Sequence, residues 1–104
     1  MTEEMARLID RYRRGAIGMD DISHRRKARK CHAEMHACYK ILRETEEGRE
    51  AIVGLLHDGD PSVRCSAAAH SLQWEPRLAG QVLEALRDSQ QGILSFEAEM
   101  VLRE

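Results

Sequence analysis

The amino-acid sequence predicts an all-α domain of about six helices, joined by short turns into antiparallel pairs. Nearly every segment repeats its apolar residues at a helical spacing, and none alternates over a strand-like length. β-branched and aromatic residues are scarce, with aromatics at 4% of the chain. A chain of 104 residues can bury roughly two-thirds of the surface it exposes when unfolded. We therefore expect one domain over residues 1–104.

The first half of the chain predicts two helices. Residues 3–16 form the first, with Thr2 as its N-cap, and Gly15 and Gly18 are expected to end it. Its apolar face holds Met5, Leu8, Ile9 and Tyr12. Residues 21–45 predict a long second helix, whose apolar residues recur in alternating steps of three and four. These residues are Ala28, Cys31, Met35, Cys38 and Leu42.

The second half predicts four shorter helices. Residues 46–57 form one helix, which ends at a turn over residues 58–61, where Gly59 allows a chain reversal. Residues 61–73 follow with Asp60 as N-cap, and residues 76–88 begin with Pro76 in the first turn. The last helix comes after a turn over residues 89–92. Its expected buried residues are Ile93, Leu94, Phe96, Val101 and either Met100 or Leu102.

Residues 58–72, D-G-D-P-S-V-R-C-S-A-A-A-H-S-L, resemble the opening helix of a HEAT repeat. Residues 74–86 resemble the return helix, and residues 96–104 resemble the closing segment of a family of small bacterial HEAT-like domains. The resemblance implies a short HEAT-like α-solenoid of stacked hairpins, with repeats over residues 46–104. Residues 1–45 show no repeat signature, and they are expected to form the N-terminal helices of the same domain.

Members of that family are similar to proteins encoded beside polymorphic or contact-dependent toxins, where they act as immunity proteins. The resemblance implies that this chain binds a cognate toxin domain and blocks its active site. If the toxin is a nuclease, it must be basic to hold its own substrate. A solenoid also offers an extended rigid surface suited to binding a partner.

An acidic cluster is the first candidate binding surface, because a basic toxin would be attracted to it. Its residues are Glu44, Glu46, Glu47, Glu50, Asp58 and Asp60. Acids at helix starts also serve as caps and dipole partners, so a purely structural role stays open for several of them. Trp74 is a further candidate, since tryptophan is enriched at binding hot spots, although packing at a helix end is the favoured interpretation.

A basic stripe predicts the alternative function, binding of nucleic acid. Its residues are Arg25, Arg29, His32, His36, Lys40 and Arg43, which fall on one face of the second helix. The alternative is a solvated face whose charges meet nearby acids, and we favour it because the pI is near 6 and few aromatics are present for base stacking.

Neither catalysis nor a cofactor is expected. His32 and His36 lie one helical turn apart, but Glu34 is not placed as in the zinc-protease motif, so no metal site is predicted. Cys31, Cys38 and Cys65 fall on apolar or small-residue faces, where thiols are usually inert. No small-molecule substrate is expected. The sequence has no membrane-length apolar run and no secretory signal, so the expected compartment is the cytoplasm.

Overall fold

The computed structural model describes every residue except 1, 22, 90 and 91. Ile22, near the expected start of the second helix, and residues 90–91, in the expected turn over 89–92, therefore lie outside the described residues. The described chain is all-α, as the sequence predicts, and holds six α-helices and one short 3-10 turn. These are α1 (Glu3–Gly18), α2 (Arg25–Leu42), α3 (Glu46–Gly54), η1 (Leu55–His57), α4 (Pro61–Ser71), α5 (Pro76–Asp88) and α6 (Ile93–Arg103).

Contacts divide the chain into two compact units, residues 1–51 and 52–104. The boundary falls within α3, and each unit is described by itself below. None of the described helices is both long enough and apolar enough to cross a membrane.

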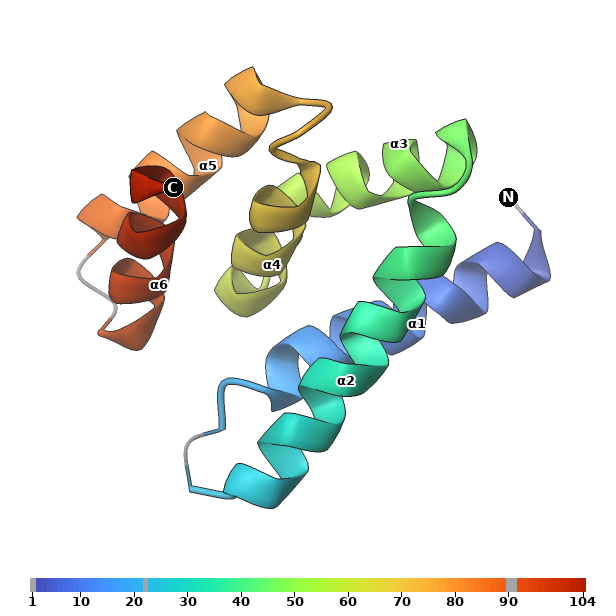
Figure 1. The fold of residues 1–104 in the computed structure, drawn as a ribbon, viewed down its shortest axis with the longest axis horizontal. Helices are drawn as coiled ribbons and strands as arrows, with labels where there is room; N and C mark the ends of the chain where they lie inside the picture. Colours follow the sequence, from blue (N-terminus) through green and yellow to red (C-terminus); the bar gives the residue numbers. More distant parts are fainter. Residues whose placement is uncertain (1, 22, 90–91) are drawn as a thin grey trace. The chain divides into compact units, whose positions relative to one another are not determined.

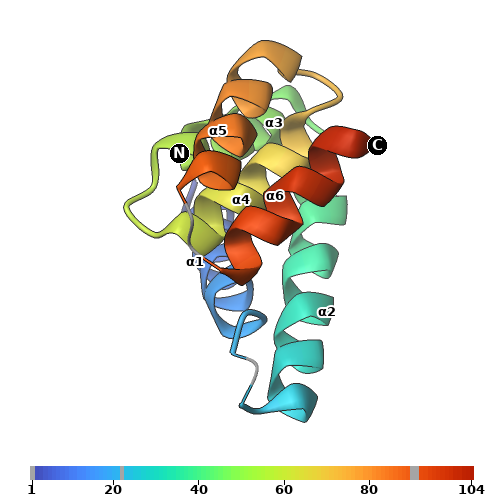
Figure 2. The ribbon, with the colours of Figure 1, turned by 90° about the vertical axis from the view of Figure 1, so that its left-hand side faces the viewer.

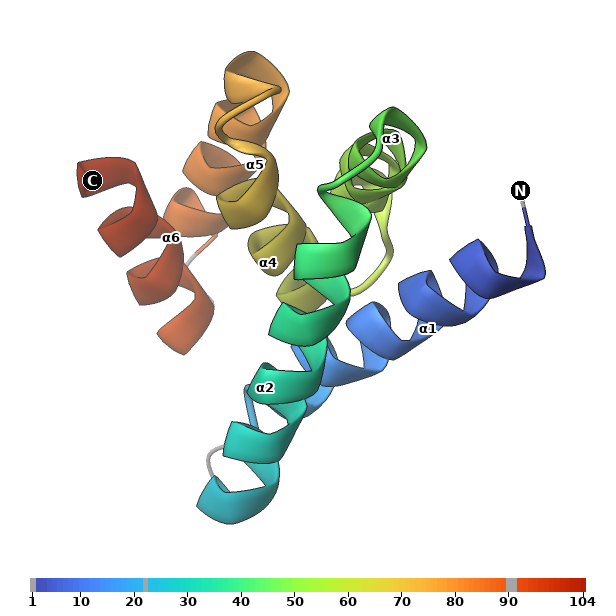
Figure 3. The same ribbon diagram turned by 45° about the vertical axis from the view of Figure 1, so that its right-hand side comes forward.

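In the first unit, α1 and α2 pack against each other as a helical hairpin (Figures 1 and 3). Thr2 caps α1 as expected, because its Oγ1 accepts a hydrogen bond from the Met5 backbone N–H at 3.1 Å. Fully buried Tyr12 and Ala16 form the core of α1. From α2, the expected Met35, Cys38 and Leu42 are buried, and so is Tyr39, which the sequence pattern did not single out.

Two glycines of α1 allow the close approach of α2. A Cβ at Gly15 would lie 2.7 Å from the Cys31 carbonyl oxygen, and one at Gly18 would lie 2.5 Å from the Cys31 Sγ. α1 runs past Gly15 and ends at Gly18, so the helix stops at the second of these glycines, as expected, and not at the first. At both positions the missing side chain makes room for α2.

The second helix is shorter at both ends than the expected residues 21–45. Before α2, Asp21 accepts hydrogen bonds from the Ser23 backbone and hydroxyl, which hold the pKa of this carboxyl below its usual value. After α2, Thr45 caps the next helix, because its Oγ1 accepts a hydrogen bond from the Gly48 N–H at 3.0 Å. The Arg49 side chain donates to the Arg43 carbonyl at 2.7 Å and braces the same turn. The turns on either side of α2 are thus held by local hydrogen bonds, while the N-cap of α2, His24, makes no side-chain capping bond.

In the second unit, α4, α5 and α6 run in alternating directions and each packs against the other two (Figure 2). The expected helix over residues 46–57 ends in the tighter η1, which packs on α4. The small residues of α4 are buried, as are Leu83 and Leu86 of α5. This close packing follows from the short side chains, which let neighbouring backbones approach each other.

The outward face of α6 exposes apolar residues that were expected to lie in the core, so this expectation is wrong. Phe96 is 61% exposed, Ile93 48% and Met100 44%. The buried residues of α6 are Leu94 and Ala98. At 100° per residue, Leu94 and Ala98 lie roughly opposite Phe96, so a helix that packs on one side only must leave Phe96 in solvent.

Candidate partner-binding surfaces

Four of the expected acidic residues gather in one stretch of the first unit. Glu44 lies in the turn after α2, and Glu46, Glu47 and Glu50 lie on α3, all of them exposed. We call these four the acidic turn. Arg43 lies 3.7 Å from the Glu44 carboxylate. Within the described part of the chain, no ion pair includes Glu46, Glu47 or Glu50. Most of the charge of the acidic turn is therefore open to a partner.

Asp58 and Asp60 belong to the second unit and have structural roles there. Asp60 is the N-cap of α4, as expected, and its Oδ1 accepts from the Ser62 N–H at 2.8 Å. The Asp58 Oδ1 accepts from the Asp60 N–H at 2.9 Å. Arg64 donates to the Asp58 carbonyl oxygen at 2.8 Å and closes the turn. For these two acids, the local hydrogen bonds favour the capping role over a binding role.

Trp74 lies half-buried in the turn between α4 and α5. Its backbone N–H donates to the Ser71 carbonyl at 3.1 Å, and the next N–H, from Glu75, donates to the same oxygen at 2.7 Å. Two backbone hydrogen bonds therefore stabilise the turn that carries the Trp74 indole. A half-buried ring at such a turn fits the packing role that the sequence favours.

The N-terminal half of α2 is strongly basic and exposed. Its cationic residues are Arg25, Arg26, Lys27, Arg29 and Lys30. None of them takes part in an ion pair among the described residues. The first turn of α2 contains no acid, although the partial positive charge of a helix N-terminus disfavours cations there by about 0.3–1 kcal/mol each. This part of the basic stripe is a solvated face, as expected, but no acid among the described residues forms an ion pair with it.

Further along α2, three aromatic rings follow one another along the helix, and the first two are stacked. The His32 and His36 rings are parallel within 6°, with centroids 6.2 Å apart. The His36 ring lies 5.6 Å from the Tyr39 ring, and the Arg43 guanidinium lies 5.2 Å from the centroid of Tyr39. Desolvation, with the charges of Lys40, His32 and Arg43, lowers the pKa of His36. His36 therefore adds little positive charge to the stripe near neutral pH.

The outward residues of α6 form a third surface, which the sequence pattern assigned to the core. A usable signal was present, because at 100° per residue the apolar residues of α6 cover about two-thirds of the circumference of the helix instead of one narrow stripe. They are Ile93, Leu94, Phe96, Ala98, Met100, Val101 and Leu102. Such a helix is either enclosed on all sides or exposes part of its apolar surface. In this fold, α6 exposes it.

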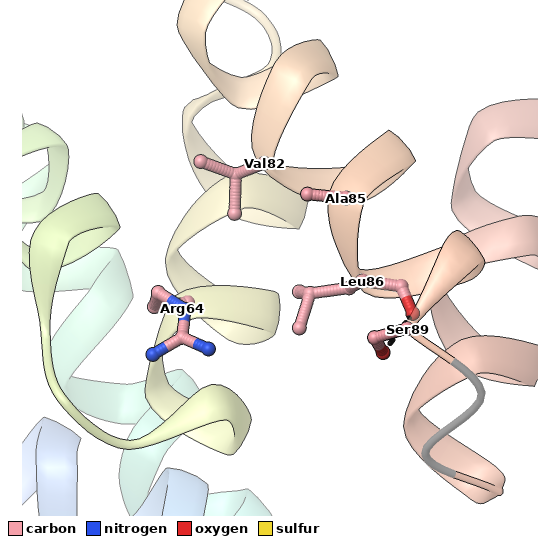
Figure 4. Close-up of a pocket in the computed structure, with 5 residues that line it drawn as sticks. All are labelled: Arg64, Val82, Ala85, Leu86 and Ser89. Atoms are coloured by element: carbon pink, nitrogen blue, oxygen red, sulfur yellow. Dashed lines mark hydrogen bonds between the residues drawn. The ribbon is translucent and has the colours of Figure 1, made fainter.

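A shallow hollow of about 130 Å³ lies between α4 and α5 (Figure 4). Arg64 lines one side, and Val82, Ala85, Leu86 and Ser89 line the other. The Arg64 side chain is engaged with the Asp58 carbonyl, and the Ser89 hydroxyl donates to the Leu86 carbonyl at 2.6 Å. The hollow is smaller than an ordinary ligand pocket of about 300 Å³ or more.

The reactive groups of the described chain are not gathered into one site. Burial raises the pKa of the Cys38 thiol, which keeps it protonated and a poor nucleophile, although nearby Arg11 partly opposes the shift. All three cysteines are thiols outside any disulfide, with Cys38 and Cys65 buried and Cys31 half-buried. Among the residues that the structure describes, no group of three His, Cys, Asp or Glu side chains is placed to hold a metal ion.

No protein-family model matches the sequence, no curated protein matches it, and no solved structure matches its fold. Three surfaces of the chain are candidates for binding a partner: the acidic turn, the basic half of α2 and the outward face of α6.

Proposed function

We propose that this chain is a binding protein that neutralises a toxin domain by covering its active site, in the manner of an immunity protein. The observation that carries the proposal is the acidic turn, where Glu46, Glu47 and Glu50 are exposed and no cation of the described chain pairs with them. The HEAT-like pattern of residues 58–72 supports the same function by resemblance.

Unpaired acids on a small helical protein suit a basic partner for two reasons. Carboxylates that are not already paired attract cations over a Debye length of about 8–10 Å, which speeds encounter. They can also replace the phosphates of a nucleic-acid substrate in a basic cleft, which excludes that substrate. The protein would act stoichiometrically, without turnover.

Reversing two charges of the acidic turn tests this function. We expect Glu46→Lys with Glu47→Lys to weaken the basic partner about tenfold or more, mainly through slower association, because complementary attraction becomes repulsion. The affinity is to be measured by calorimetry against the copurified partner, with the association rate measured by surface plasmon resonance.

The matched control is Glu3→Lys with Glu4→Lys, which makes the same charge change in the first turn of α1. Both variants carry the same helix-dipole cost, and the control also loses the exposed Arg7–Glu3 ion pair, so circular dichroism is used to confirm that both keep the helical content of the unmodified protein. An unchanged affinity in the acidic-turn variant, or an equal loss in both variants, would remove the acidic turn from the interface.

A second function, binding of nucleic acid by α2, is favoured by the unpaired cations at its start. Lys and Arg at a helix N-terminus lower the stability of the helix, because the helix dipole repels positive charge there. Phosphates that pair with these cations would remove that repulsion. The first turn of α2 contributes Arg25 and Arg26, and Arg29 follows on the stripe. Double-stranded nucleic acid fits this surface, since no base-stacking aromatic lies among these cations.

Arg25→Glu with Arg29→Glu is expected to weaken binding to a duplex oligonucleotide about tenfold or more and to reduce the slope of log K against log salt by about 2, roughly 0.9 for each lost phosphate contact. Fluorescence anisotropy at several salt concentrations measures both. Arg7→Glu with Arg14→Glu, on the exposed side of α1, is the control. Weak binding with no salt dependence in the unmodified protein would exclude this function.

A further inference from the structure

We infer that α2 enters the major groove of B-form DNA and contacts the phosphates of both strands. The inference rests on the nucleic-acid function proposed above for α2, and it names the form of the nucleic acid, the groove and a second row of cations. It arises from the exposed side of α2 that lies opposite the buried residues of the same helix. We call this side the groove face.

The middle of the groove face is lined by small side chains. α1 packs against the side of α2 that buries Met35 and Leu42 (Figure 3). At 100° per residue, the opposite direction passes close to Arg26, Ala33 and Ala37, and all three are exposed. The two alanines therefore let another surface approach the backbone of α2 closely.

A row of two cations lies on each side of this middle line. At 100° per residue, Arg29 and Arg25 lie about 50° and 90° to one side, and Lys30 and Lys27 lie about 50° and 110° to the other. All four are exposed, and within the part of the chain that the structure describes none of them forms an ion pair. Glu34 is the one acid in the sequence of α2 and lies at the edge of the face. The groove face is therefore strongly positive on both sides.

The dimensions and the charges of the groove face match the major groove of B-form DNA. A helix with its side chains is about 10–12 Å across, and that groove is about 12 Å wide with a phosphate backbone along each wall. A helix that lies on one backbone would use one row of cations, whereas a helix in the groove uses both. Arg26 is placed to reach a guanine edge, and alanine suits the methyl group of thymine.

Two other anionic partners fit the groove face less well. Duplex RNA is A-form, and its major groove is too deep and narrow to be read by side chains. Helices that lie on an anionic membrane bury large apolar residues between their cations, but Ala33 and Ala37 occupy that place here. B-form DNA satisfies both the shape and the charge of the face.

The second row of cations provides the first test. We expect Lys27→Gln with Lys30→Gln to weaken binding of a 20-base-pair DNA duplex about tenfold, and to lower the slope of log K against log salt by about 2. Arg25→Gln with Arg29→Gln removes the same charge from the other row and should have an equal effect. Fluorescence anisotropy of the full chain at several salt concentrations measures both. Arg7→Gln with Arg14→Gln, on the exposed side of α1, is the control that should leave binding intact.

The shape of the groove face provides the second test. We expect a DNA duplex to bind about tenfold or more tighter than an RNA duplex of the same sequence, because only B-form geometry admits the helix. Ala33→Leu with Ala37→Leu keeps the charge and the helix propensity, and its added bulk should weaken DNA binding about tenfold. Ala6→Leu, at an exposed alanine of α1, should leave DNA binding unchanged. Circular dichroism confirms that each variant keeps the fold.

The outcomes separate the inference from the function on which it rests. Equal affinity for the DNA and RNA duplexes would overturn the inference while leaving the nucleic-acid function in place. So would unchanged DNA binding by Lys27→Gln with Lys30→Gln, or by Ala33→Leu with Ala37→Leu. If the unmodified protein bound neither duplex in a salt-dependent way, the nucleic-acid function itself would be contradicted, and the inference with it.

Discussion

Gly48→Ala is expected to destabilise the protein by about 3 kcal/mol, one of the largest effects of any single methyl group in this chain. Gly48 is buried in the first turn of α3, and a Cβ there would collide with the carbonyl oxygen of Leu42. That oxygen belongs to the backbone, so no side chain can move aside, and overpacking of this kind costs about 1–3 kcal/mol or more. Urea unfolding followed by circular dichroism measures the loss.

Gly80→Ala is the matched control, because Gly80 also lies in a helix but a Cβ added there would meet no neighbouring atom within 4 Å. Alanine has the higher helix propensity, so this substitution should stabilise the protein by about 0.5–1 kcal/mol. Gly15→Ala should again destabilise, since a Cβ there would lie 2.7 Å from the Cys31 carbonyl oxygen. If Gly48→Ala and Gly15→Ala left the free energy of unfolding unchanged, the close backbone contacts of Gly48 with Leu42 and of Gly15 with Cys31 would be contradicted.

The second large effect is the loss of stability expected for Leu83→Ala, which should far exceed the loss for Phe96→Ala. Leu83 is 0% exposed in α5, so its loss removes buried apolar surface and leaves a cavity, which costs about 2–5 kcal/mol. Phe96 is the larger residue, yet at 61% exposure its replacement should cost less than about 1 kcal/mol. Thermal unfolding of the two variants, side by side, measures the difference.

The order of these two losses tests the position of α6. If Phe96→Ala were as damaging as Leu83→Ala, the phenylalanine would be buried and the outward face of α6 would not exist as a surface. The outcome we expect leaves Phe96 free to serve a partner at little cost to the fold.

The class of fold could be predicted because helical periodicity and caps are local properties. Thr2, Asp60 and Pro76 mark helix starts through their own backbone chemistry, and all three lie where the sequence placed them. The bounds of α2 and the role of Gly15 could not be predicted in the same way. Whether Gly15 ends a helix or admits a neighbour depends on the path of α2, which no local pattern contains.

The surfaces were harder to predict than the helices, because exposure depends on which neighbours are present. The periodicity of α6 shows that Phe96 is apolar and helical, but not that α4 and α5 cover the opposite side. The charges of α2 and α3 could be located by sequence alone. Whether they are paired within the chain required the positions of the neighbouring side chains.

The most direct test of the proposed function is to purify the tagged protein from its native cells, with and without nuclease treatment. The molar mass of the complex is then measured by light scattering. We expect a one-to-one complex with a basic protein that survives nuclease and is lost with Glu46→Lys and Glu47→Lys. Recovery of nucleic acid alone, or a protein partner that binds the variant equally well, would contradict the proposed function.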